Sequence, residues 1–146
     1  MHKIRTEAIL AAPPDRVFAV LADFERYREW NPLTLKASGR AALGARVPMT
    51  FVNPGRPGVT ISQTVKVTAC DPGRKLEWVG RIPLIFTGRH FFELEPWEGG
   101  TRLRHGEDLS GYVAWTIRKS AIAEHFVPAY EALNTALAAR LAKEAP

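Results

Sequence analysis

Residues 34 to 110 alternate apolar and polar side chains with a period of two, and turns rich in Gly and Pro interrupt the alternation at short intervals. This period places successive side chains on opposite faces of a strand, so each uninterrupted stretch predicts a half-buried β-strand. Short turns join strands that run antiparallel. The stretches are TLKASGRA, ARVPMTFV, VTISQTVKVTAC, KLEWVGR, FTGRHFFELEP and TRLRHGEDLS, and with KIRTEAIL at residues 3–10 they predict an antiparallel sheet of about seven strands.

Two short helices are predicted between the first and second of these strands. The two prolines at positions 13 and 14 cannot continue a strand ladder but suit the start of a helix. Apolar residues on one helical face then predict a helix near 14–22, a break around Asp23 and a second short helix through Glu29. An Asn-Pro pair follows, and it ends the second helix because the residue before a proline is pushed out of the helical region.

The C-terminal segment from about Tyr112 to Lys143 changes to a helical period. Apolar residues recur there every three or four positions and predict one long amphipathic helix. Pro128 lies inside this segment, and a proline removes an intrahelical hydrogen bond and clashes with the preceding turn. We therefore expect a kink or a restart of the helix near Val127.

Composition narrows the class of protein. A chain of 146 residues suits one core, and its longest apolar runs fall far short of the ~20 residues that a membrane span needs. The N-terminal residues show no secretory signal, so we expect a cytoplasmic protein. The net charge of +5 is spread along the chain with acids interleaved, which does not favour nucleic-acid binding. The single cysteine, Cys70, excludes an intramolecular disulfide.

The turn letters WEGG fix a register for the hairpin over residues 86–110. Counting outward from this turn places Leu94 opposite Leu103, Phe92 opposite His105 and His90 opposite Glu107. Because strand side chains alternate, all six share one face, and the apolar members identify it as the inward face. The sequence therefore predicts two histidines and a glutamate clustered inside the sheet.

Three roles are open for His90, His105 and Glu107. They can anchor the polar group of a ligand, form a satisfied buried cluster, or act as a general acid and base, and they are the only catalytic candidates. Two histidines and a carboxylate also match the ligand count of a catalytic metal site, but these come from two neighbouring strands, and we expect no metal. The chain has no P-loop, dinucleotide fingerprint or nucleophile elbow, so we expect no cofactor.

The order of the predicted elements resembles the START/Bet v 1-like (SRPBCC) superfamily, in particular its bacterial polyketide cyclase/dehydrase-like members. AAPPDRVFAVLADFERYREWNP is similar to the family's opening passage, in which a proline-led helix precedes a Trp-Asn-Pro-like motif. RHFFELEPWEGGTRLRHGEDLSG resembles its late hairpin, and FVPAYEALNTALAARL resembles its closing helix. The resemblance covers essentially the whole chain and implies a single domain over residues 1–146.

This resemblance implies an α+β helix-grip fold, in which a curved antiparallel sheet wraps around the long C-terminal helix and leaves an elongated cavity. Large apolar residues that face inward then become candidate ligand-binding residues. Plain core packing is the competing interpretation for each aromatic residue among them, Trp30 above all. The candidate ligand-binding residues are Trp30, Met49, Phe51, Trp78, His90, Phe92, His105, Glu107, Ile122, Phe126 and Tyr130.

We expect a protein that binds a small hydrophobic ligand, lipid-, polyketide- or aromatic-like, in this internal cavity. The alternative is a cofactor-independent enzyme of the cyclase/aromatase or dehydratase kind, whose His-Glu group moves protons. A third hypothesis is an interaction module similar to a co-chaperone. The expected partner is a small hydrophobic molecule, with no nucleic acid and no transmembrane segment, in a monomer or a homodimer. These patterns leave the identity of the ligand open.

Overall fold

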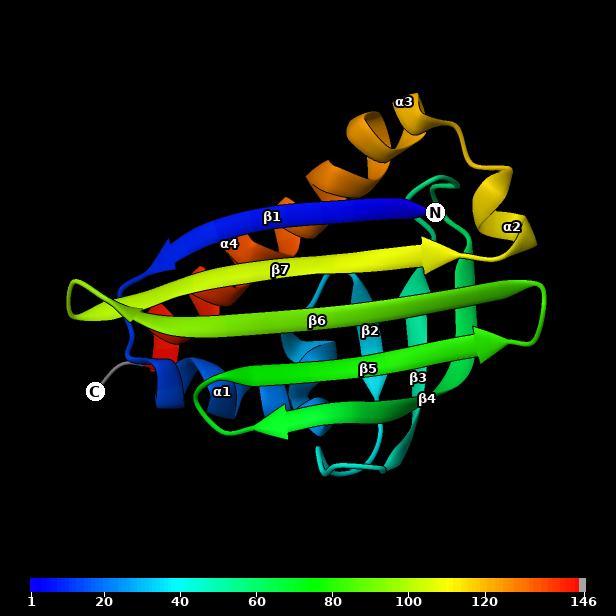
Figure 1. The fold of residues 1–146 in the computed structure, drawn as a ribbon. Coiled ribbons are helices and arrows are strands. Elements are labelled where there is room, and N and C mark those ends of the chain that lie inside the picture. The colour runs from blue at the N-terminus through cyan, green and yellow to red at the C-terminus, as the bar shows by residue number, and fades with distance from the viewer. Residues whose placement is uncertain (145–146) are drawn as a thin grey trace.

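Seven strands form one antiparallel sheet in the computed structural model, which describes residues 1–144. The strands are β1 (His2–Leu10), β2 (Thr34–Ala37), β3 (Arg46–Val52), β4 (Thr60–Asp71), β5 (Lys75–Ile82), β6 (Phe86–Trp97) and β7 (Gly100–Ser110). Their order is β1-β7-β6-β5-β4-β3-β2, so β1 joins the sheet beside β7. The sheet is strongly curled, and Figure 1 shows β2 and β3 crossing behind β5 and β6. The predicted sheet of about seven antiparallel strands is confirmed.

The hairpin of β6 and β7 has the register that its turn predicts. His90 lies opposite Glu107, and Phe92 lies opposite His105. The connection is tighter than the four letters WEGG suggest, because Trp97 and Gly100 already pair with each other. The two remaining turn residues, Glu98 and Gly99, have φ angles of 47° and 84°. Two successive positive φ angles are what a type I′ hairpin turn requires, and such a turn matches the twist of the strands it joins.

The two helices after β1 also agree with the prediction. They are α1 (Pro14–Ala22) and η1, a 3₁₀-helix (Phe24–Glu29). The side-chain oxygen of Asn31 accepts hydrogen bonds from the backbone N–H groups of Leu33 and Thr34, at 2.9 and 2.8 Å. These bonds turn the chain from η1 into β2, because an asparagine side chain can replace the backbone acceptor of a turn.

The C-terminal helical segment contains a break that its pattern does not predict. It comprises α2 (Tyr112–Trp115), α3 (Lys119–Ala121), η2, a π-helical turn (Ile122–Phe126), and α4 (Val127–Glu144). The prediction of one helix is wrong between α2 and α3, where Arg118 is extended with ψ 143°. The carbonyl of Ile117 is bound there by the ring of His2 at 2.7 Å instead of by a helical N–H. At Val127 the chain does not restart: Lys119 to Glu144 is continuous, and the π-helical turn η2 lies directly before Pro128, which has no N–H to donate to the preceding turn.

The core lies between the concave face of the sheet and α4, which runs behind β1 and β7 in Figure 1. α4 buries Leu133 and Leu137 completely, and the sheet contributes the fully buried Phe92 and Leu76. Such a stripe of buried residues on one face of a helix is the consequence of its 3.6-residue period. The helix-grip architecture expected from the sequence is confirmed.

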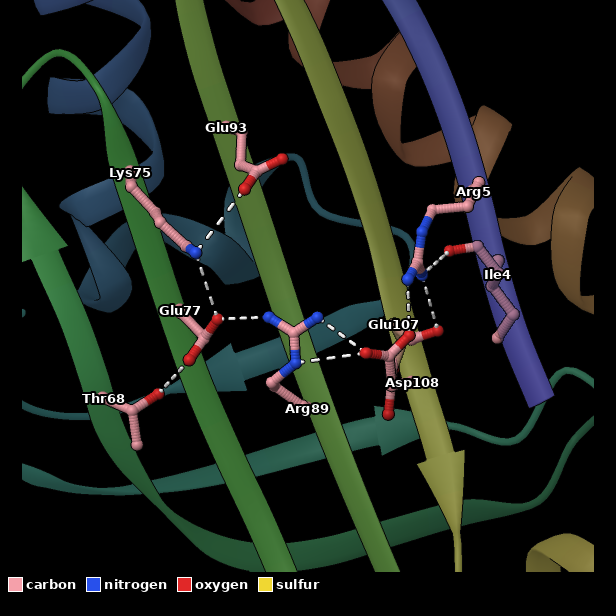
Figure 2. Close-up of polar contacts among 9 residues, drawn as sticks. All are labelled: Ile4, Arg5, Thr68, Lys75, Glu77, Arg89, Glu93, Glu107 and Asp108. Atoms are coloured by element: carbon pink, nitrogen blue, oxygen red, sulfur yellow. Dashed lines mark hydrogen bonds and ion pairs between the residues drawn. The ribbon is translucent and has the colours of Figure 1, made fainter. Parts of the chain in front are cut away.

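The opposite, outer face of the sheet carries charges rather than a second apolar layer (Figure 2). Arg89 binds Glu77 at 2.5 Å and Asp108 at 2.6 Å, and Arg5 binds the other oxygen of Asp108 at 2.7 Å. The guanidinium groups of Arg5 and Arg89 both lie over the ring of Phe91, at 4.9 and 4.8 Å from its centroid. These cation–π contacts explain how an outward-facing phenylalanine becomes buried. Residues 1–144 contain no helix that is long and apolar enough to cross a membrane.

Candidate functional site

A cavity of about 240 Å³ lies between the concave face of the sheet and the C-terminal helices. Its wall is mostly apolar and is built from five strands, from α2, η2 and the first turn of α4, and from the loops beside them. The residues that line it are Leu33, Phe51, Val52, Asn53, Pro54, Ile61, Gln63, Val65, Trp78, Gly80, Ile82, Ile85, Phe86, Gly88, His90, Glu107, Leu109, Val113, Ile117, Phe126 and Tyr130. Its volume exceeds the ~150 Å³ that holds a benzene ring and lies just below the ~300 Å³ at which pockets for drug-sized ligands begin.

The cavity opens to solvent beside the turn between β5 and β6. Four apolar residues that line it are also half exposed, namely Ile82 and Ile85 at this turn, Val113 in α2 and Ile61 in β4. The neighbouring Leu84 is 96% exposed and Trp115 is 76% exposed. Exposed apolar side chains of this size around an opening are unusual on a surface without a binding role.

The inner end of the cavity is polar. Nδ1 of His90 lies 3.0 Å from Oε1 of Glu107, and the hydroxyl of Tyr130 donates a very short hydrogen bond to the same oxygen. His90 and Tyr130 are almost completely buried, whereas the Glu107 side chain retains some exposure. Strand register places His90 opposite Glu107, and one face of α4 adds Tyr130.

A second set of contacts continues from His90 away from the cavity. Nε2 of His90 lies 2.8 Å from Nε2 of His105, and Nδ1 of His105 lies 2.9 Å from Oδ1 of Asn134. The side-chain amide of Asn134 donates to the hydroxyl of Thr6 at 2.9 Å, and this hydroxyl donates to the carbonyl of His105 at 2.7 Å. The chain of contacts thus joins β6, β7, α4 and β1.

The protons of this chain can be assigned in sequence, starting at Thr6. Its only proton goes to a carbonyl oxygen, so its oxygen must accept from the NH₂ group of Asn134. Oδ1 of Asn134 therefore faces His105, and Nδ1 of His105 must carry a proton. Burial and the neighbouring His90 hold the pKa of His105 well below its ordinary value, so the ring is neutral and its Nε2 carries a lone pair instead of a proton. Nε2 of His90 must then be the donor between the two rings.

One proton remains to be shared between His90 and Glu107. Either His90 is doubly protonated beside a carboxylate, or a protonated Glu107 donates through Oε1 to Nδ1 of a neutral His90. Burial and the neighbouring Glu107 raise the pKa of Tyr130 well above its ordinary value, so its hydroxyl stays protonated as a donor. In both arrangements Oε2 of Glu107 carries no proton and is a hydrogen-bond acceptor.

Aromatic rings hold the two histidines in place. His90 stacks between Trp78, at a centroid distance of 4.9 Å and an angle of 18°, and Tyr130, at 5.3 Å and 19°. His105 stacks on Phe92 at 4.5 Å and 10°. These apolar neighbours exclude water, and a polar group in such surroundings is costly unless it is hydrogen-bonded.

The structure brings most of the candidate ligand-binding residues to the cavity or directly behind it. Those that line the cavity are Phe51, Trp78, His90, Glu107, Phe126 and Tyr130. Those that are buried in the core without lining it are Met49, Phe92, His105 and Ile122. Trp30 lies elsewhere, at the end of η1, where its ring contacts Tyr27 edge-on at 5.5 Å. Trp30 is therefore partly buried against the core and does not line this cavity.

Sequence reasoning missed the polar residues that complete the site. Thr6 and Asn134 come from the first strand and the last helix, so no local spacing connects them to the hairpin. Gln63 lines the cavity and does carry a signal, because it is the one polar residue in the inward row Ile61, Gln63, Val65 of β4. Within residues 1–144 no group of three His, Cys, Asp or Glu side chains is placed to hold a metal ion.

Comparison of the structure with solved proteins identifies the fold. A START superfamily protein from Mycobacterium smegmatis superposes with a TM-score of 0.81 at 15% identity, over 99% of this chain and 100% of that one. A protein from Thermus thermophilus superposes with a TM-score of 0.79 at 16% identity, over 99% of this chain and 100% of that one. DynU16, from the dynemicin biosynthetic locus, gives 0.73 at 18% identity, and the match covers 99% of this chain but only 48% of DynU16.

Comparison at the level of sequence identifies the family. No curated protein matches the sequence. The profile of the family described as polyketide cyclase / dehydrase and lipid transport matches residues 1–142. Since this match spans nearly the whole chain, the chain belongs to the polyketide cyclase/dehydrase and lipid transport family, and it shares its fold with the START superfamily protein from Mycobacterium smegmatis.

Proposed function

We propose that the protein binds a small hydrophobic molecule in the cavity between the sheet and α4, with the molecule's polar group at Glu107. The observation that carries this proposal is an apolar cavity that opens to solvent at one end and has a hydrogen-bonded polar group at the other. Its volume of about 240 Å³ suits a ligand of one or two rings or a short acyl chain. The proposal takes residues 1–146 as one domain, acting in the cytoplasm as a monomer or homodimer without nucleic acid.

Native mass spectrometry of the protein purified from its own host tests this function. We expect a bound hydrophobic molecule at near-stoichiometric amount, which denaturing extraction releases for identification. The Glu107→Gln variant keeps the shape of the side chain but replaces a carboxyl oxygen by an NH₂ group that cannot accept, and leaving the ligand's buried donor unpaired corresponds to about tenfold to a hundredfold weaker binding. Glu93→Gln, on the outer face of neighbouring β6, is the matched control and should retain the ligand. A protein that carries no ligand and shows no thermal shift with lipids or aromatic compounds would refute the proposal and favour the interaction module.

A cyclase or dehydratase is the second candidate, and one feature favours it. The pair formed by His90 and Glu107 shares a proton at the wall of the cavity, where a general acid or base would have to stand. The family description names cyclases and dehydrases, and DynU16 comes from a biosynthetic locus. An enzyme would lose turnover of a poly-β-keto thioester in Glu107→Gln while it keeps most of its affinity for the substrate. A binding protein would lose affinity and show no turnover before or after the change.

A further inference from the structure

The inner wall of β4 carries an amide that no other side chain uses. Gln63 stands in a row with Ile61 and Val65, and it lines the cavity. Among residues 1–144 no partner within hydrogen-bond distance is found for its side-chain oxygen or nitrogen, whereas the amide oxygen and nitrogen of Asn134 each have a partner. A partly buried amide that faces an apolar cavity is costly unless a ligand or water satisfies it.

Two glycines on neighbouring strands make room for this amide and for the free oxygen of Glu107. A Cβ atom on Gly80 would lie 2.6 Å from Oε1 of Gln63, and one on Gly88 would overlap Oε2 of Glu107. Gly80 and Gly88 are directly opposed in the register of β5 and β6. Opposed positions have Cβ atoms only about 5 Å apart, so the amide and the carboxyl oxygen lie over adjoining parts of the same floor.

The free oxygen of Glu107 requires a donor from any ligand that reaches it. Oε1 is occupied by Tyr130 and His90, whereas no partner is found for Oε2 among the described residues. Because Asn134 fixes the tautomer of His105, Oε2 is an acceptor wherever the shared proton resides. The NH₂ group of Gln63 supplies the complementary donor on the other side of the floor.

We propose that Gln63 and Glu107 form a polar clamp over Gly80 and Gly88, which selects a neutral ligand with a hydroxyl group and rejects a carboxylate. This inference rests on the proposed function and names the polar group of its ligand. A hydroxyl donates to Oε2 of Glu107, and an oxygen on the same edge of the ligand accepts from Gln63. A carboxylate instead brings two further acceptors and a negative charge against Oε2, and neither arrangement of the shared proton relieves this.

Three small probes of similar size test the clamp by titration at pH 7.5. They are 2-naphthol, 2-methylnaphthalene and 2-naphthoate. Wild-type protein should bind 2-naphthol about thirtyfold more tightly than 2-methylnaphthalene, because the two hydrogen bonds of the clamp are each worth about 1 kcal/mol. It should bind 2-naphthoate more weakly than either. Gln63→Met keeps the length of the side chain without the amide. It should therefore weaken the binding of 2-naphthol about fivefold and leave the affinity for 2-methylnaphthalene unchanged.

Gly80→Ala provides a second, independent change. Its new methyl group occupies the place of the Gln63 amide and should reproduce the loss for 2-naphthol, although the amide itself is still present. Thr64→Val, on the exposed face of the same strand, is the control and should leave all three affinities unchanged. Circular dichroism melts show whether each variant is folded.

Each outcome of the titrations separates the clamp from the proposed function. Equal binding of 2-naphthol and 2-methylnaphthalene in the wild type and in Gln63→Met would overturn the clamp and leave the cavity as a general hydrophobic site. Tightest binding of 2-naphthoate would overturn it as well. If neither 2-naphthol nor 2-methylnaphthalene binds, both the clamp and the proposed function are wrong.

Discussion

Replacing Asn134 by leucine should remove the hydrogen bonds that fix the tautomer of His105 in the buried network. Asn134 is 5% exposed and makes two side-chain hydrogen bonds of 2.9 Å, one to His105 and one to Thr6. Thr6 keeps its own donated bond, so the main loss is the partner of the His105 N–H. A buried donor without a partner costs about 1–3 kcal/mol, and leucine refills the volume. We expect a loss of about 2 kcal/mol in the free energy of unfolding, or a melting temperature about 6 °C lower for a chain of this length.

The second readout is the tautomer of His105, measured from ¹⁵N chemical shifts of its ring. In the wild type the proton should reside on Nδ1, and in Asn134→Leu the ring is free to move it to Nε2. Thr135→Ala is the matched control on the next position of α4, since its hydroxyl is exposed and bonds only its own helix. This control should change stability by less than about 0.5 kcal/mol. Equal stability of the two variants, together with an unchanged tautomer, would refute the assignment of protons from Thr6 outward.

Three further changes test the network and the sheet. The pKa of His105 in the folded state lies below its ordinary 6.5, so the unfolded chain binds more protons than the folded chain when the pH falls. Urea unfolding should therefore show the full free energy of unfolding above pH 6.5. Below pH 6.5 this free energy should fall by at most about 1.4 kcal/mol per pH unit. Gly106→Ala should lower the free energy of unfolding by at least about 2 kcal/mol, since its Cβ would overlap the carbonyl oxygen of Ile4 on β1. Gly55→Ala is the control, because its Cβ meets only ordinary contacts, and it should be as stable as the wild type in the same assay. Arg89→Met should cost about 1 kcal/mol in low salt and less in 1 M NaCl, because the Arg89 side chain is about a third exposed and salt can screen its ion pairs. An equal loss in both salts would contradict an electrostatic origin.

The sequence predicted the site as far as local pattern reaches. A tight turn and a period of two determined which residues oppose each other in β6 and β7, so the pairing of His90 with Glu107 followed from counting alone. The contacts with Tyr130 and Asn134 depend on how α4 is rotated against the sheet, and periodicity gives a helix face but no rotation to within one residue. The break before α3 depends on His2, which lies 115 residues away from Ile117. Such long-range partners leave no trace in a local window.

The depth of the network explains how residues that touch no ligand can set its selectivity. Thr6, Asn134 and His105 lie behind the cavity wall and have no freedom to exchange donor and acceptor roles. Their fixed order makes His90 a donor toward His105, and this leaves a single shared proton at Glu107 with one bare acceptor oxygen facing the cavity. If Asn134→Leu frees the tautomers, His90 can turn its one proton toward Oε1 of Glu107, and the carboxyl proton then resides on Oε2, where it can donate to a carboxylate. The variant should then lose the preference for 2-naphthol over 2-naphthoate, although Gln63 and Glu107 are both intact. Titration of the variant with these two probes shows whether the buried network sets the selectivity or whether Gln63 and Glu107 suffice.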